Sequence, residues 1–441
     1  RNWKKVGQMT IDSDGVEGGD TETVSLSAID WQTNCAADTG AELRACNIIT
    51  NGTAMNLTGE SIKRSLGHRD YGMYGYDIKY NLSAANHDIT IGYRQHSDYR
   101  DRHDSGISET YTLGSNNTMA MTASDYVKSF GAGMSGGVSG NDDYASAESF
   151  SIVDRITHGN FVTTLGMRHE DVEYWEYTAG THGKSRSVNN SETMFAASTV
   201  MNMGNGKSAF VAYSQGYQPT GSNTQDPEES DNYEIGYRSR NVHGFMEVVA
   251  FYVDYDMLNE TCGIEAGCGN ADNGQENAGE AHASGVEFTY KVNNLFPSTQ
   301  MKGAGEMSGI RYPLVFSATI SESERDVSTS SSKLDGNAIP YTPEEVFYIS
   351  FGAETNDWDY KFAAKYTDEY FTNDANTLKT EDAWILDFQA GINLDKLGMA
   401  GARAFVNIDN LLDKTYLASS HEYGNRPNKP QSVMAGITLD F

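Results

Sequence analysis

The last ten residues of the chain, SVMAGITLDF, alternate strictly between apolar residues and small or polar ones. Val433, Ala435, Ile437, Leu439 and Phe441 share one face of this segment if it is extended. A period of two is the period of a β-strand. Chain ends are normally polar and frayed, so this pattern predicts a terminal strand that is tied into a sheet and carries one apolar face.

The same alternation recurs along the chain. In WILDFQAGIN, Trp384, Leu386 and Phe388 fall on one face, while Asp387 and Gln389 fall on the other. The segments GVEFTYKV, PLVFSATIS and DYKFAAKYT have the same two-faced pattern. The sequence therefore predicts an all-β protein whose strands are apolar on one side and polar on the other.

The mean hydropathy of −0.54 excludes a bundle of membrane-spanning helices. Such a helix needs about 20 consecutive apolar residues, whereas the richest run here, FMEVVAFYV, is short and contains Glu247. A transmembrane β-barrel stays polar on average because its lipid-facing and lumen-facing residues alternate. The low hydropathy is therefore compatible with a barrel in a membrane.

The spacing of the strands favours a membrane barrel over a soluble sandwich, which also alternates. Short turns near residues 83–87, 157–160 and 203–207 alternate with long connections at residues 12–66, 100–143 and 256–279. Outer-membrane barrels have short periplasmic turns and long extracellular loops, and counting back from Phe441 gives about sixteen antiparallel strands. Tyr and Trp in EDVEYWEY and DEYF lie at predicted strand ends, where aromatic girdles meet the membrane interfaces.

The net charge of −29 excludes a nucleic-acid partner, since phosphate backbones are bound by clustered Lys and Arg. No enzyme activity, cofactor or metal is predicted. The stretch Gly133–Gly137 matches the G-x-S-x-G of hydrolases, but no strand precedes it and no helix follows it.

The four cysteines form two local pairs in polar stretches, Cys35 with Cys46 and Cys262 with Cys268. They are expected to form disulfides in an oxidising compartment. The rival is a metal site, which the missing CxxC spacing and the lack of a nearby His pair disfavour.

From residue 208 onward the chain resembles the TonB-dependent receptors of the bacterial outer membrane. The resemblance is carried, in this order, by AFVAYSQGYQPTGSN, DPEESDNYEIGYRSRN, MEVVAFYVDYDMLNE, ASGVEFTYK, FVNIDNLLDKTYLAS and GNRPNKPQSVMAGITLDF. The segment YGMYGYDIKYNLSAANHDITIGYRQHSDYRDRHD further resembles the ferric dicitrate receptor branch. In this family a terminal aromatic residue such as Phe441 is the signal for barrel insertion.

The resemblance implies a barrel of about 22 strands around an N-terminal plug. Residues 1–441 then correspond to the C-terminal portion of one such barrel, with the plug and the first strands outside this chain. We expect the strand at 431–441 to pair with a segment from elsewhere, either more of the same protein or a separate chain that also supplies the plug. Pairing of residues 3–11 with residues 433–439 would instead indicate a self-closed porin of about sixteen strands.

The candidate ligand-binding residues are cations and polar groups near the predicted mouth. Because Ile89, Ile91 and Tyr93 form the outward face of their strand, the side chains of Arg94 and His96 should face the lumen. Such cations would hold the carboxylates of an anionic chelate, unless they pair with neighbouring acids as Arg168 and Arg238 could with Glu170 and Glu234. The full candidate set is Arg94, His96, Arg100, Arg102, His103, Gln215 and Tyr217.

The resemblance implies energy-coupled uptake of a scarce nutrient, most simply a ferric chelate. The expected partners are the TonB complex, acting through the plug, and the lipid and lipopolysaccharide of the outer membrane. Two alternatives remain open, a passive sixteen-stranded porin and a surface receptor or adhesin that binds a protein through its loops.

Overall fold

The computed structural model describes 14 segments of the chain: residues 2–17, 20–24, 61–113, 119–120, 126–127, 141–178, 184–221, 225–262, 274–277, 279–296, 309–328, 334–374, 376–421 and 424–439. Within them the secondary structure is β, apart from the short 3₁₀ helix η3 (Asp395–Leu397). No helix in these segments is long and apolar enough to cross a membrane.

Most of the described residues belong to one antiparallel sheet of 19 strands. Three of them are short and pair only with a neighbouring long strand: β2 (Asp20–Val24), β5 (Met119–Ala120) and β6 (Tyr126–Val127). The remaining sixteen strands pair each with the next, in agreement with the predicted number. In order of pairing they are β1 (Asn2–Glu17), β3 (Ser61–Ala84), β4 (His87–Leu113), β7 (Asn141–His158), β8 (Phe161–Thr178), β9 (Lys184–Gly204), β10 (Lys207–Gln218), β11 (Glu228–Arg240), β12 (Gly244–Asp256), β15 (Gly279–Val292), β16 (Leu314–Ser328), β17 (Glu345–Glu354), β18 (Trp358–Thr367), β19 (Ala383–Asn393), β20 (Ala402–Asp409) and β23 (Ser432–Leu439).

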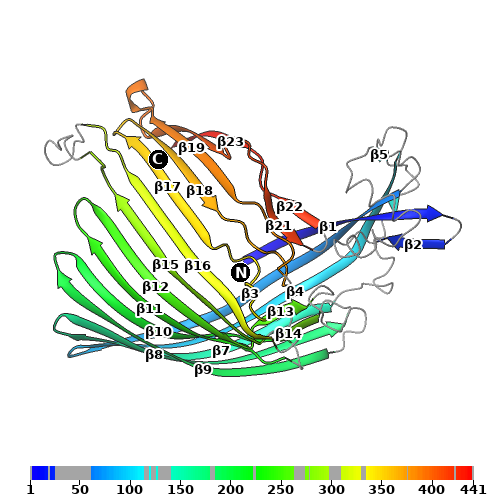
Figure 1. Ribbon diagram of the computed structural model, residues 1–441, viewed down its shortest axis with the longest axis horizontal. Helices are drawn as coiled ribbons and strands as arrows, with labels where there is room; N and C mark the ends of the chain where they lie inside the picture. The colour runs from blue at the N-terminus through cyan, green and yellow to red at the C-terminus, as the bar shows by residue number, and fades with distance from the viewer. Residues whose placement is uncertain are drawn as a thin grey trace.

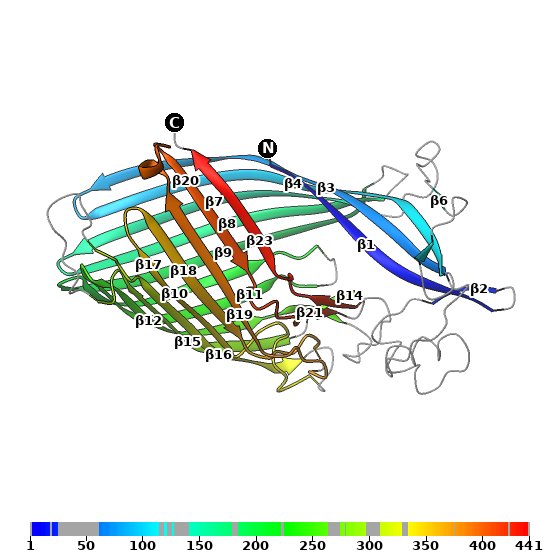
Figure 2. The same ribbon diagram turned by 90° about the horizontal axis from the view of Figure 1, so that it is seen from above.

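The sheet is strongly curled, as Figures 1 and 2 show from two directions. Two small hairpins lie outside it, β13 (Asn259–Cys262) with β14 (Gly274–Asn277) and β21 (Leu417–His421) with β22 (Gly424–Pro427). Short turns join the strands at one end, for example between Ala84 and His87 and between Gly204 and Lys207. Long connections leave from the other end, as the sequence predicts.

The cross-strand register confirms the two faces expected from the alternation. Val211, Ile235 and Ala250 lie opposite one another on β10, β11 and β12, and they belong to the apolar face. We call this the outer face and the opposite one the inner face. On the outer face Ile235 is 61% exposed and Ile437 63% exposed. Whole rows of exposed aliphatic side chains are typical of a surface that contacts lipid.

Aromatic residues border the outer face toward the long-loop end. Tyr144 stacks on Trp175 with ring centroids 5.8 Å apart, and Tyr213 lies 5.2 Å from Tyr233. The prediction for EDVEYWEY is therefore confirmed for Trp175. The prediction for DEYF is wrong, because Tyr370 and Phe371 lie in the connection after β18 and not on a strand.

The predicted limits of two long connections are also wrong. The segment 12–66 was expected to be one connection, but β1 continues to Glu17 and β3 starts at Ser61. In the same way β4 continues past residue 100 to Leu113. Backbone pairing continues beyond the lipid-facing zone, where alternation is no longer required, so the hydropathy pattern does not reveal the true strand ends.

The two edges of the sheet are β1 and β23. Lys5 lies opposite Asp70 of β3, and Ile437 lies opposite Ala404 of β20. Between the described residues of β1 and β23 there is no backbone pairing. The arrangement that would favour a self-closed porin is therefore not seen in this part of the chain. Phe441 lies outside the described residues.

The face assignment predicts opposite tolerance to charge at two adjacent positions. Ile235→Arg in the intact protein should destabilise the barrel by about 2–4 kcal/mol, because Arg then faces hydrocarbon. Glu234→Arg, one residue away on the inner face, should change the stability little. Urea unfolding in lipid vesicles would measure both variants, and equal destabilisation by the two substitutions would contradict the assignment.

Candidate functional site

The inner face of β4 carries three of the predicted cations. Gln95 lies on the outer face, opposite Tyr76 of β3 and Glu148 of β7. Arg94 lies on the inner face, opposite Asp77 of β3 and Ser149 of β7. His96 and Arg100 follow Arg94 at intervals that keep them on the same face. Arg102 and His103 lie opposite Arg69 and His68 in the backbone register, but their side chains are outside the described part of the structure.

Arg100 belongs to an ionic network at the long-loop end of β4, β7, β8 and β9. Its guanidinium pairs with the carboxylate of Asp143, which also accepts a hydrogen bond of 2.7 Å from the Tyr174 hydroxyl. Arg186 donates to Glu176 at 2.8 Å and lies 5.5 Å from the Tyr174 ring. These opposite charges compensate one another in ion pairs, although Arg100 Nε, Asp143 Oδ2 and Arg186 Nε are buried without a hydrogen-bond partner among the described residues.

Arg94 is different, since it makes no ion pair or hydrogen bond with another side chain in the described segments. Two groups that follow Arg94 on the inner face of β4 are also incompletely satisfied in the described residues: His96 Nδ1 and Asp98 Oδ1 are buried with no hydrogen-bond partner. His96 Nε2 does approach Asp98 Oδ2, at 3.8 Å. Buried polar atoms normally have partners, so this strip of inner wall is suited to meet a ligand or further polypeptide.

Arg168 and Arg238 show the alternative, in which inner-wall cations are neutralised by neighbours. Arg168 Nη2 lies 3.0 Å from Glu170 Oε1, as predicted. Arg238 pairs with Glu247 of β12, so the predicted partner Glu234 is wrong. The reason is geometric: Arg238 and Glu247 are directly opposite in the antiparallel register, and sequence spacing alone does not reveal cross-strand neighbours.

Gln215 and Tyr217 do not join the cations of β4. They follow Tyr213 on β10 at intervals of two, which places them on the outer face, beyond the tyrosine row. Gln215 Oε1 accepts a hydrogen bond of 3.0 Å from the backbone N–H of Phe195, and the hydroxyl of Tyr217 is buried with no partner in the described residues.

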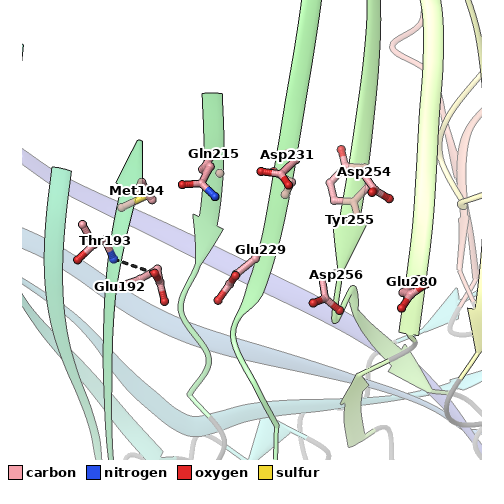
Figure 3. Close-up of a pocket in the computed structure, with 12 residues that line it drawn as sticks. Glu192, Thr193, Met194, Gln215, Glu229, Asp231, Asp254, Tyr255, Asp256 and Glu280 are labelled. Carbon is pink, nitrogen blue, oxygen red and sulfur yellow. Dashed lines mark hydrogen bonds between the residues drawn. The ribbon is translucent and has the colours of Figure 1, made fainter. Parts of the chain in front are cut away.

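Gln215 lines an open hollow of about 310 Å³ that is strongly acidic. Figure 3 shows its carboxylates on β9, β11, β12 and β15, with Gln215 of β10 among them. No group of three or more His, Cys, Asp or Glu in the described segments is arranged to hold a metal ion. Such a hollow repels an anionic ligand. Its acids are Glu192, Glu229, Asp231, Asp254, Asp256 and Glu280.

Arg325 at the loop end of β16 was not predicted as important, yet it is only 1% exposed. Its Nη2 donates to Asp374 Oδ1 at 3.0 Å, and its backbone N–H donates to the carbonyl of Asn337 at 2.9 Å. Asn337 in turn donates from Nδ2 to the carbonyl of Asp374 at 2.9 Å. Arg325 thus fastens the β16–β17 connection to the β18–β19 connection. Only the fold brings these segments together, so no sequence signal marks them.

The joined connections present two tyrosines at the mouth. The rings of Tyr341 and Tyr370 have centroids 6.1 Å apart. Burial raises the pKa of Tyr370, and the neighbouring phenols of Tyr416 and Tyr341 raise it further. Tyr370 therefore stays neutral at physiological pH and offers an aromatic face and a hydroxyl without charge.

The cysteine prediction is not tested by this structure. Cys35, Cys46 and Cys268 lie outside the described residues, and of Cys262 only the backbone, at the end of β13, is described. The stretch Gly133–Gly137 also lies outside the described residues.

Comparison with known proteins gives consistent relatives. The family described as "TonB dependent receptor-like, beta-barrel" matches residues 12–411. The ferrichrome outer membrane transporter/phage receptor of Escherichia coli (strain K12) is 22% identical over 303 residues, which are 66% of this chain and 37% of that protein.

Among solved structures, the ferric citrate transporter FecA in its unliganded form matches with a TM-score of 0.63 and 15% identity, over 87% of this chain and 58% of FecA. The copper transporter OprC matches with a TM-score of 0.59 and 9% identity, over 87% of this chain and 57% of OprC. At these identities the structural likeness shows the fold alone. The chain spans between about a third and three fifths of the length of these relatives.

The burial of Arg325 leads to a prediction about how the β16–β17 and β18–β19 connections are held together. Arg325→Leu should speed hydrogen exchange at residues 337–342 and 372–378 at least tenfold, since breaking a buried pair costs about 3–5 kcal/mol. Lys379→Leu in the same region removes an exposed pair with Glu369 (2.8 Å), and exposed pairs contribute about 0–1 kcal/mol. If the two variants exchange alike, Arg325 does not fasten these connections.

Proposed function

Because the chain belongs to the family of TonB-dependent receptor β-barrels, which are proteins of the outer membrane, we propose that it forms the wall of a transporter that takes up a ferric chelate. The family is one of transporters and receptors. Iron-chelate transporters recur among the relatives, although the copper transporter OprC has the same fold. The fold alone therefore does not identify the cargo.

The observation that carries the proposal is the inner face of β4. Arg94 makes no ion pair or hydrogen bond with another described side chain there, although Asp77 lies directly opposite it, and His96 and Asp98 have buried polar atoms without a hydrogen-bond partner in this part of the chain. A ferric chelate with carboxylate or hydroxamate oxygens would find hydrogen-bond donors along this strip. The acidic hollow on the outer face would repel such a ligand, so the proposed path runs along the inner wall past Arg100, His96 and Arg94.

The open edges support a second part of the proposal. Unpaired N–H and C=O groups cost several kcal/mol each in lipid. We therefore propose that strands from outside this sequence, in the same protein or in a separate chain, pair with β1 and β23 and complete the barrel. A plug supplied with them would fill the interior and receive the action of the TonB complex. The outer face would contact lipid and lipopolysaccharide.

Uptake measured with and without an energised TonB complex tests the function. Cells that carry the intact protein should accumulate iron-55 supplied as a chelate, with saturation, and deletion of TonB should abolish the uptake. A panel of chelates, including ferric citrate and a hydroxamate, would identify the cargo class. Uptake that is unsaturable and independent of TonB would contradict the proposal and favour a passive pore.

The role of Arg94 can be tested against a matched cation. Arg94→Gln should lower uptake of an anionic ferric chelate about fivefold, the equivalent of roughly 1 kcal/mol. Arg168→Gln, on the same inner face but paired with Glu170 at 3.0 Å, should have a smaller effect. Transport rates at subsaturating chelate would compare the two variants, and an unaltered rate for Arg94→Gln would remove Arg94 from the proposed path.

A further inference from the structure

The connection between β15 and β16, residues 293–313, differs from its neighbours. It leaves from the short-turn end of the sheet, where β3 and β4 are separated by only two residues and β9 and β10 likewise. Figure 1 shows β15 and β16 ending at the same end as these hairpins. The structure describes both legs of the connection, residues 293–296 and 309–313.

Hydrogen bonds make the two legs a fixed stem. The backbone N–H of Leu295 donates to the carbonyl of Tyr312 at 2.9 Å. The Asn294 side-chain oxygen accepts hydrogen bonds from the backbone N–H groups of Tyr312 (3.2 Å) and Phe296 (3.3 Å). The stem is an extension of the β15–β16 hairpin beyond Val292 and Leu314.

The stem is also attached to the strands on both sides. Arg311 and Glu354 exchange two backbone hydrogen bonds of 2.9 Å, and their side chains form an ion pair of 2.8 Å. On the other side, Asn293 donates from its backbone to the carbonyl of His243 in the β11–β12 turn, at 3.0 Å. The position of the stem relative to the barrel wall is therefore defined.

The stem continues the outer face. Leu314 lies opposite Phe351 on that face, and Arg311 lies opposite Glu354, so Tyr312 falls on the outer side between them. Tyr312 stacks on Phe351 with centroids 6.1 Å apart and planes at 9°. Phe296 meets Tyr312 edge-on at 5.3 Å and remains 50% exposed.

Other aromatic and apolar groups lie at the same end. Trp358 and Tyr360 at the start of β18 stack at 5.7 Å, and they lie opposite Ile392 and Ala390 on the outer face. Val242, in the turn bonded to Asn293, is 85% exposed, and Leu295 is 39% exposed. Aromatic rings at a strand end are typical of the membrane interface.

We propose that this stem is a membrane anchor, in which Phe296, with the neighbouring Val242, enters the periplasmic leaflet of the outer membrane. The occupant of the exposed apolar surface is lipid and not a periplasmic protein, because the surface is continuous through Tyr312 and Phe351 with the lipid-facing wall. The short-turn end is the periplasmic end in this family of barrels. The proposal depends on the location in the outer membrane and not on the cargo.

Spin-label accessibility tests the anchor. Phe296→Cys in the intact protein, labelled with a nitroxide and placed in phosphatidylethanolamine/phosphatidylglycerol vesicles, should collide more with oxygen than with a water-soluble nickel chelate. Ile235→Cys on the outer face supplies the lipid reference. Asn205→Cys, in the β9–β10 turn, supplies the aqueous reference, and the unsubstituted protein controls for labelling of native cysteines.

A label at position 296 that behaves like the one at 235 supports the anchor. A label that behaves like the one at 205 overturns it and would indicate an aqueous surface open to a periplasmic partner. If the Phe296→Cys variant does not insert into the membrane, the Phe296→Trp variant replaces it and its tryptophan fluorescence is measured. The fluorescence of the unsubstituted protein is subtracted. Quenching of the added fluorescence by phospholipids brominated near the headgroup supports the anchor, and quenching only by aqueous iodide overturns it.

Discussion

The structure depends on one constraint, that every backbone N–H and C=O group in a membrane must find a partner within the protein. A β-sheet meets this constraint strand by strand, and it is complete only when no edge remains. The sixteen long strands satisfy it along fifteen successive pairings, from β1 through β3 to β20 and β23. At the two edges, β1 and β23, the described chain alone does not satisfy this constraint. Completion of the barrel by further strands is therefore central to the proposed transporter.

The two faces of the same sheet carry different side chains because they meet different surroundings. The outer face is apolar where it contacts lipid, because lipid demands only apolar contact, and its aromatic rows separate this zone from the polar and acidic groups toward the long-loop end. The inner face is heterogeneous. Arg168 and Arg238 form ion pairs with Glu170 and Glu247, whereas Arg94 forms no ion pair within the part of the chain that the structure describes. An inner wall of mostly compensated charges with a few uncompensated groups can guide an anionic ligand without trapping it.

The period-two pattern predicted the fold well, because each lipid-facing strand must alternate, as SVMAGITLDF and WILDFQAGIN do. It also placed the apolar row through Ile89 and Ile91 on one face of β4. The pattern ends where lipid ends, so the extensions of β1 to Glu17 and of β4 to Leu113 were missed. Cross-strand partners such as Arg238 with Glu247, and the loop contact of Arg325 with Asp374, depend on register and loop packing, which spacing along the chain does not encode.

Hydrogen exchange at individual amides of β23 tests the central claim most directly. Successive N–H groups of an edge strand point alternately toward its partner and toward its free side. In the intact protein in lipid, the account predicts slow exchange at every amide from Val433 to Leu439, because further strands pair with the side that β20 leaves open. Rapid exchange at every second amide would show that this edge is unpaired and would contradict the account.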